Sequence, residues 1–184
     1  QVFVIGVVLA PLEMLAPAEK WEDKRIVRVD VVHTFINLLC IVPFGTFLVL
    51  GPMEDGIANL LGQNPSEPAW HLGCVLPWLS DHPLILFMTY FVILDFVSWG
   101  MHRLQHKFAW WWALHSLHHS QRQMSLWTDD RGSVIDSVLQ ALVLASVGLV
   151  IGVPPVEYGF ILFLGKMMEN ISHANTRVGF GPLL

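Results

Sequence analysis

Long apolar stretches separated by short polar segments are the main pattern along this chain. A helix that crosses a bilayer needs roughly 20 mostly apolar residues. Residues 31–51, 83–101 and 134–153 reach this length, and each is predicted to form a spanning helix. Pro43 lies inside the first of these and is expected to kink it, because proline cannot donate the backbone hydrogen bond of a helix.

Three further apolar stretches complete the pattern. Residues 2–12 are predicted to be the remainder of an earlier span, and residues 71–80 are expected to lie at the membrane interface or to re-enter the membrane rather than cross it. Residues 156–171 are interrupted by Lys166 and Glu169, but they follow a Pro-Pro pair that favours a tight helical hairpin with the preceding span. The predicted fold is therefore all-α, an integral membrane helical bundle of about four to five transmembrane helices.

The composition supports this class. Of the 184 residues, 54% are hydrophobic and only 14% are charged, whereas soluble domains carry about 25% charged residues. The net charge of -5 leaves no basic surface, which excludes nucleic acid as a partner. Cys40 and Cys74 are too few for a disulfide framework and are interpreted as buried packing residues.

The two ends of the chain lack the features of natural termini. Gln1 begins inside an apolar stretch without a basic leader, and Leu184 ends an apolar segment without a polar tail. We therefore expect residues 1–184 to be a single membrane domain that is cut at both ends.

Basic residues gather on one side of the predicted spans. Four of them precede the span over 31–51 and four follow the span over 83–101, whereas residues 52–82 contain no lysine or arginine. By the positive-inside rule, the basic segments face the cytoplasm. This pattern predicts an inner-membrane or endoplasmic-reticulum protein in that orientation.

Five histidines follow the span over 83–101 within eighteen residues, as His102-x-x-x-His106 and His115-x-x-His118-His119. Residues three or four apart project from one face of a helix, so each cluster can present its imidazoles in one direction. A histidine is costly at a membrane unless it has a partner. The clusters therefore predict a metal site on the cytoplasmic side.

The number of histidines indicates the kind of site, although neutral imidazole accepts iron, zinc, copper and nickel alike. A catalytic zinc commonly takes three protein ligands, whereas five or six histidines are enough to begin a two-metal site. The predicted hairpin returns His173 to the same side as a sixth. The chain has no Glu-x-x-His motif, which excludes the soluble di-iron carboxylate bundles. The plainer alternative is a set of interfacial histidines without a metal.

Together these residues resemble a known family. Asp95 through His102-Arg103-x-x-His106, then His115-x-x-His118-His119-Ser120 and His173-Ala174-Asn175-x-Arg177, are similar to segments of the fatty acid hydroxylase/sterol desaturase superfamily. The resemblance implies an integral membrane oxidoreductase whose histidines hold a non-haem centre of two iron ions. It also implies that O2 and a separate electron-donor protein are used to hydroxylate or desaturate a C–H bond of a lipid in the bilayer.

The resemblance assigns roles by position. It implies five metal ligands and a sixth residue that is either a ligand or a group that orients one: His102, His106, His115, His118, His119 and His173. Two departures accompany it, because the family's third box, His-x-x-His-His, falls beyond residue 184, and Ser133 stands where many relatives carry a histidine. With an incomplete ligand set, this chain is expected to be inactive and to bind metal weakly or with altered stoichiometry.

Residues beside the clusters are predicted to support the site. Asp95, two helical turns before His102, is expected to orient a ligand histidine, with a structural hydrogen bond as the alternative. Asn175 is expected either to support the metal site in the same way or to bind headgroup oxygens. The tryptophans at 110–112 are predicted to anchor the chain at the bilayer interface. The remaining histidines are isolated and are interpreted as ordinary polar residues: His33, His71 and His82.

Other functions fit parts of the pattern. A membrane cytochrome with bis-histidine haem needs single histidines on facing helices rather than tandem clusters. A metal transporter needs ligands near the bilayer midplane, and an inactive metal-binding fragment is a further alternative. Within the leading hypothesis, sterol, fatty acyl and related lipids all fit, as do hydroxylation and desaturation.

Overall fold

The computed structural model describes residues 3–21, 24–45, 47–48, 51–62 and 70–177. Helices form the framework of this described part, and its one isolated β-bridge joins Pro17 to Thr176. The expectation of an all-α fold is confirmed for these residues.

Two of the described helices are long and apolar enough to cross a membrane: α7, Pro83–Lys107, and α9, Val134–Ile151. The spans predicted over 83–101 and 134–153 therefore form as helices. α7 continues past its apolar part and carries the first histidine cluster on its last turns. α9 ends where Gly152 adopts a left-handed φ of 70°, a conformation that glycine enters without a steric penalty.

The span predicted over 31–51 is less regular than expected. α2, Lys24–Ile36, continues into the π-helix η2, Asn37–Ile41, and then into α3, Val42–Gly45. Pro43 cannot donate to the carbonyl four residues before it, and the wider π turns lie directly ahead of it. The predicted disturbance of the helix at this proline is therefore present as a change of helix type.

The other described helices of the N-terminal half are short. They are η1 Val4–Leu9, α1 Ala10–Leu15, α4 Gly51–Leu61, α5 Leu72–Val75 and α6 Pro77–Ser80. α5 and α6 are far shorter than a bilayer crossing requires, as expected for residues 71–80. Cys40 and Cys74 are exposed, so the packing role expected for them is wrong in this structure, because both side chains point away from the cores described below.

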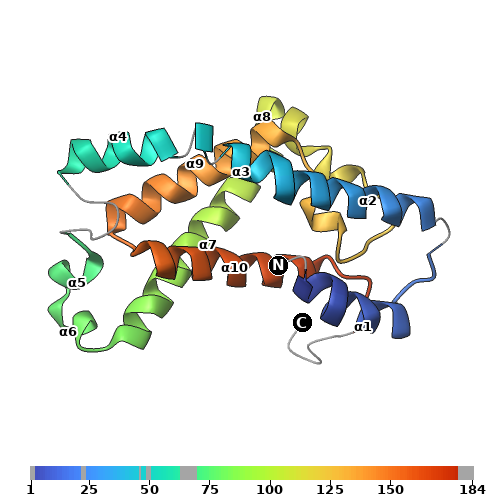
Figure 1. Ribbon diagram of the computed structural model, residues 1–184, viewed down its shortest axis with the longest axis horizontal. Coiled ribbons are helices and arrows are strands. Elements are labelled where there is room, and N and C mark those ends of the chain that lie inside the picture. The colour runs from blue at the N-terminus through green and yellow to red at the C-terminus, as the bar shows by residue number, and fades with distance from the viewer. Residues whose placement is uncertain (1–2, 22–23, 46, 49–50, 63–69, 178–184) are drawn as a thin grey trace.

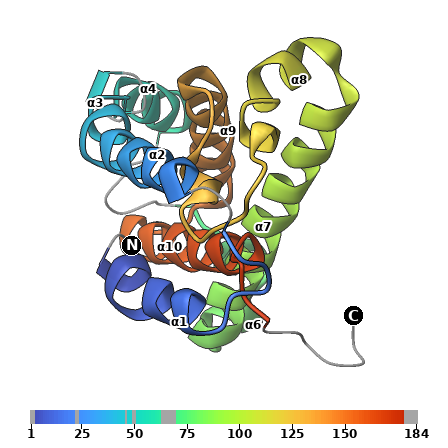
Figure 2. The same cartoon turned by 90° about the vertical axis from the view of Figure 1, so that its right-hand side faces the viewer.

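α7 is the central element of the fold. It runs from the end formed by α5 and α6 to the opposite end at α8, Ala109–His115, and both α9 and α10, Pro155–Ser172, contact it (Figure 1). The chain reverses at the Pro-Pro pair as predicted, but α9 and α10 then diverge (Figures 1 and 2). The hairpin is open because an apolar cluster with α7 fills the angle between the two helices: Tyr90, Leu94, Val153 and Ile161.

A second apolar cluster lies at the histidine end of the molecule. Ile5, Leu126 and Trp127 are its buried members, and residues of α2 and α10 pack against it. Phe35 of α2 stacks on Trp127, with ring centroids 6.3 Å apart. This cluster fixes the loop that follows the histidines against the N-terminal helices, and so builds one wall of the site.

Candidate metal centre

Four histidines converge where α7 and α8 meet. His102 and His106 lie one turn apart on α7, and their Nε2 atoms are 3.1 Å apart. His115 at the end of α8 and His119 in the following turn form a second pair, with Nε2 atoms also 3.1 Å apart. One ligand atom from each of the four lies within 4.8 Å of the others. We call these residues the four-histidine group.

A second convergence brings together three separate segments. His118 comes from η4, His118–Ser120, Asp129 from η5, Thr128–Asp130, and His173 from the C-terminal end of α10. Their ligand atoms also lie within 4.8 Å of one another. The imidazole centroids of His118 and His173 are 5.0 Å apart, and Oδ1 of Asp129 lies 3.2 Å from Nδ1 of His173. We call these residues the mixed group.

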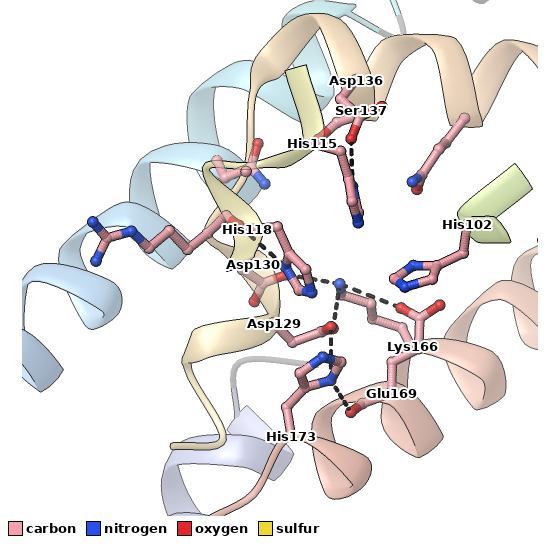
Figure 3. Close-up of a pocket in the computed structure, with 14 residues that line it drawn as sticks. His102, His115, His118, Asp129, Asp130, Asp136, Ser137, Lys166, Glu169 and His173 are labelled. Carbon is pink, nitrogen blue, oxygen red and sulfur yellow. Dashed lines mark hydrogen bonds and ion pairs between the residues drawn. The ribbon is translucent and has the colours of Figure 1, made fainter. Parts of the chain in front are cut away.

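The two groups are neighbours. The ring centroid of His118 lies 5.2 Å from that of His115 and 6.4 Å from that of His102. A cavity of about 140 Å³ lies between them, lined by members of both groups and by polar side chains of α9 and α10 (Figure 3). The structure thus brings all six predicted histidines to one place, and their role as metal ligands stays a prediction.

Hydrogen bonds determine which nitrogen of the mixed-group histidines is available. Nδ1 of His118 donates to the carbonyl of Arg131 at 3.3 Å, and Nδ1 of His173 donates to the carbonyl of Glu169 at 2.8 Å. A carbonyl oxygen can only accept, so Nδ1 carries the hydrogen in both rings. The Nε2 atom of each ring then keeps the lone pair that a metal requires.

Asp136, in the first turn of α9, accepts three hydrogen bonds. Its Oδ2 accepts from Nδ1 of His115 at 2.9 Å, and its Oδ1 accepts from Nε2 of Gln105 and Nε1 of Trp111, each at 2.8 Å. Asp136 and His115 are both buried. This carboxylate joins α7, α8 and α9 and leaves Nε2 of His115 free of hydrogen for a metal.

Charged side chains form the α10 side of the cavity. Nζ of Lys166 lies 2.5 Å from Oδ2 of Asp129, 3.3 Å from Oδ1 of Asp130 and 3.5 Å from Oε2 of Glu169 (Figure 3). The two charges that interrupt the apolar pattern of residues 156–171 are therefore used at this cavity. Their presence explains why α10 is less apolar than α7 and α9.

The loop that carries His118 and Asp129 is tied to α2. Nη1 of Arg131 lies 3.3 Å from Oδ1 of Asp30 and donates to Oε1 of Gln121 at 2.8 Å, while Nε2 of Gln121 donates to Asp30. His33 donates from Nδ1 to the carbonyl of Asp130 at 3.2 Å. His33 therefore supports the loop from outside the cavity.

The structure differs from the expectations for Asp95 and Asn175. Asp95 is exposed, and it has no hydrogen bond or ion pair to another described residue. Seven residues of helix rise by about 10 Å, which is farther than a carboxylate can reach toward His102. Asn175 is buried, but its side chain accepts from the backbone N–H of Glu19 at 2.9 Å and donates to the Glu19 carbonyl at 2.8 Å. Asn175 therefore binds the backbone of the N-terminal segment and does not orient a histidine.

The tryptophans at 110–112 divide between two environments. Trp110 is exposed, in keeping with the predicted interfacial anchor, whereas Trp111 bonds Asp136. The ring of Trp112 lies 5.1 Å from that of His106. At the other end of α7, His71 accepts from the N–H of Gly73 and His82 donates to the Trp78 carbonyl, so both are remote from the cavity.

Two carboxylates of the site were not among the residues singled out from the sequence. Asp136 is an acid at the start of an apolar span, and Asp129 belongs to an Asp-Asp pair shortly after the second histidine cluster. Both positions carry a signal, because an acid beside a membrane segment needs a partner. Their actual partners lie on other helices, which periodicity does not show.

Burial and neighbouring imidazoles favour the neutral form of His118 and His119. Burial, followed by the charge that His173 would carry, lowers the pKa of His118 from 6.5 to about 4. Burial and the nearby His115 also lower the pKa of His119. Neutral imidazole is the form that binds metal, so these side chains need not lose a proton near pH 7.

The low pKa of His118 predicts acid sensitivity of the metal-free protein. Because this pKa is about 4 in the folded chain and 6.5 in the reference state, the unfolded chain binds more protons between these values. The free energy of unfolding should therefore fall by about 1–2 kcal/mol between pH 7 and pH 5. Thermal unfolding in detergent measures this, and His118→Ala should flatten the pH dependence. If the free energy of unfolding of His118→Ala depended on pH as strongly as that of the wild-type chain, the low pKa of His118 would be contradicted.

The donor set fits divalent transition metals. The two groups together offer six imidazoles and one carboxylate, and two ligands bound at about 2.1 Å to one ion lie roughly 3.0–3.4 Å apart in octahedral or tetrahedral geometry. The Nε2 pairs at 3.1 Å already have this spacing. Side chains of both groups line one cavity, so the residues present fit a site for two metal ions.

Comparison with known proteins agrees with this site. Residues 87–184, over half of the chain, match the family model for fatty acid hydroxylase. The matched region contains every member of the two groups. Curated proteins and solved structures gave no match.

Proposed function

The chain belongs to the fatty acid hydroxylase family, and from this premise we propose that it is a membrane-bound non-haem di-iron oxidoreductase. It would use O2 to hydroxylate or desaturate a C–H bond of a lipid. The observation that supports this most is the convergence of six histidines in two neighbouring groups, with four of them lining one cavity at the end of an apolar helix.

The residues of the site have distinct roles in this proposal. The four-histidine group would hold one iron ion and the mixed-group histidines the other. When bound, iron supplies the activation of O2 that an unactivated C–H bond requires. Asp136 orients His115, and the carbonyls of Arg131 and Glu169 orient His118 and His173. These contacts orient the three rings so that the lone pair of each Nε2 atom is available to a metal ion.

The membrane supplies the substrate. The outer face of α7 exposes large apolar side chains along its length, including Leu84, Met88, Val92, Phe96 and Trp99. Such a surface suits contact with acyl chains. A lipid held in the same bilayer would reach the metal end of α7, where the family resemblance places oxidation of a sterol, a fatty acyl chain or a related lipid.

The histidine end is proposed to face the cytoplasm. Arg103 and Lys107 lie on the last turns of α7 beside the four-histidine group, whereas residues 52–82 have no basic side chain. This distribution follows the positive-inside rule. A cytoplasmic site would be accessible to a separate electron-donor protein, which the proposed reaction needs.

Metal analysis tests the proposed ligands. Full-length chain purified in detergent and loaded with iron should contain about two ions per chain. The double variant His118→Ala/His119→Ala removes one ligand from each group and should lose most of this iron. His82→Ala is the control, because that histidine lies at the other end of α7. Equal iron in the double variant and the control would contradict the proposal.

Visible absorption distinguishes the proposed enzyme from a haem cytochrome, and product analysis distinguishes hydroxylation from desaturation. The ring centroids of the four-histidine group lie as little as 4.6 Å apart, so its imidazoles contact each other directly and leave no room for a porphyrin between them. We therefore expect no Soret band, and a Soret band with stoichiometric haem would favour the cytochrome. Labelled oxygen from ¹⁸O2 in the lipid would identify hydroxylation, and a new double bond would identify desaturation.

A further inference from the structure

Building on the proposed function, we infer that Asp129 is a metal ligand. The second centre then has two histidines and one carboxylate, His118, His173 and Asp129, whereas the first centre is held by imidazoles. The family resemblance implied histidine ligands alone, so this assignment makes the two centres of this chain chemically different.

The position of Asp129 supports the assignment. Its side chain is 5% exposed, and it lies between His118 and His173 at the edge of the cavity (Figure 3). All three ligand atoms fall within 4.8 Å of one another. Two ligands on opposite sides of one ion at about 2.1 Å are about 4.2 Å apart. Only one pair of three ligands can lie on opposite sides, so the widest pair must close by about 0.6 Å and the others to roughly 3.0–3.4 Å, which side-chain rotations can supply.

Hydrogen bonding directs one oxygen of Asp129 toward the histidines. Lys166 contacts Oδ2 at 2.5 Å, while Oδ1 lies 3.2 Å from Nδ1 of His173, whose Nε2 keeps the lone pair for a metal. A carboxylate accepts through both oxygens, so the ion pair with Lys166 leaves Oδ1 available. Nδ1 of His173 already donates to the Glu169 carbonyl at 2.8 Å, so this ring does not depend on Asp129 for its orientation.

The charge around Asp129 suits a divalent cation. Lys166 is shared among Asp129, Asp130 and Glu169, so the carboxyl groups outnumber the ammonium that they surround three to one. A bound metal would offset this excess. A centre of two histidines and one carboxylate is typical of non-haem iron sites that keep coordination positions open. The metal ion of the mixed group therefore has more open coordination positions than the ion of the four-histidine group.

Cobalt binding tests the ligand directly, because Co²⁺ occupies such sites and reports its ligands through visible absorption. The full-length chain in detergent, freed of metal, is titrated with Co²⁺ and should bind two equivalents. Asp129→Asn should weaken the second equivalent at least tenfold. Asp130→Asn, which also loses a carboxylate that pairs with Lys166, should keep both. A wild-type second equivalent in Asp129→Asn would overturn the inference while leaving the proposed function intact.

Asp129→His covers the case in which the asparagine variant does not fold. This variant restores a ligand but replaces its oxygen by nitrogen. It should therefore bind both equivalents of Co²⁺, and its visible absorption band should be shifted relative to that of the wild-type chain. An unshifted band would place residue 129 outside the coordination sphere and overturn the inference. Failure of the wild-type chain to bind any Co²⁺ would overturn the proposed function itself, so the two failures are distinguishable.

Discussion

Replacing Asp136 by asparagine is expected to weaken metal binding at the four-histidine group by about 10–100-fold. Trp111 can only donate to residue 136, so the asparagine carbonyl must face it, and the NH2 group then faces His115. Nδ1 of His115 would have to accept this hydrogen bond. The ring hydrogen would move to Nε2, which is the atom needed for the metal. The fold should change little, because the asparagine fills the same space.

Co²⁺ titration with visible absorption measures this effect at each centre. Asp136→Ala should show the same loss of affinity together with a lower stability, because it leaves the donors of Gln105, Trp111 and His115 without an acceptor, at about 1–3 kcal/mol for each of the buried pair Gln105 and His115. Asp81→Asn is the matched control, since Asp81 is exposed near the start of α7. If Asp136→Asn bound metal like this control, the orienting role of Asp136 would be refuted.

Glu13→Ala is expected to lower the free energy of unfolding by roughly 2–5 kcal/mol. Glu13 is fully buried in α1, and its Oε1 accepts from the backbone N–H of Leu126 at 3.0 Å and of Asn175 at 2.6 Å. Alanine would leave both buried amides without a partner. Glu13 thereby joins α1 to the loop before η5 and to the segment after α10, which adjoin Asp129 and His173 respectively.

This geometry predicts a selective effect on metal binding as well. The second Co²⁺ equivalent should weaken more than the first, because only the mixed group depends on the segments that Glu13 joins. Glu13→Gln keeps a carbonyl acceptor and should lose less stability. Glu19→Ala is the control, since that side chain is exposed. Thermal unfolding in detergent that is identical for Glu13→Ala and Glu19→Ala would contradict the role of Glu13.

Much of the fold followed from local pattern. The apolar runs predicted α7 and α9, and the Pro-Pro pair predicted the reversal before α10. The four-residue spacing of His102 and His106 predicted their shared direction, because a helix repeats its faces every 3.6 residues. These predictions succeeded because each feature is set by residues that are neighbours along the chain and needs no contact with a distant segment.

The spread of α9 and α10 could not be predicted in the same way. The Pro-Pro pair determines where the chain turns, but the angle after the turn depends on what fills the space between the helices. Tyr90 and Leu94 of α7 pack there with Val153 and Ile161. Side-chain volume from a distant helix therefore decided the geometry of the hairpin.

By itself the sequence determined the helical class, the apolar helices, the histidine clusters and their common end of the molecule. Only the tertiary structure decided which carboxylates serve them, with Asp136 beside His115 and Asp129 beside His173, while Asp95 is exposed. The reason is physical. Helical periodicity fixes the direction of a side chain relative to its own helix, whereas its partner is set by the packing of helices whose residues lie 21 to 44 positions apart in the chain.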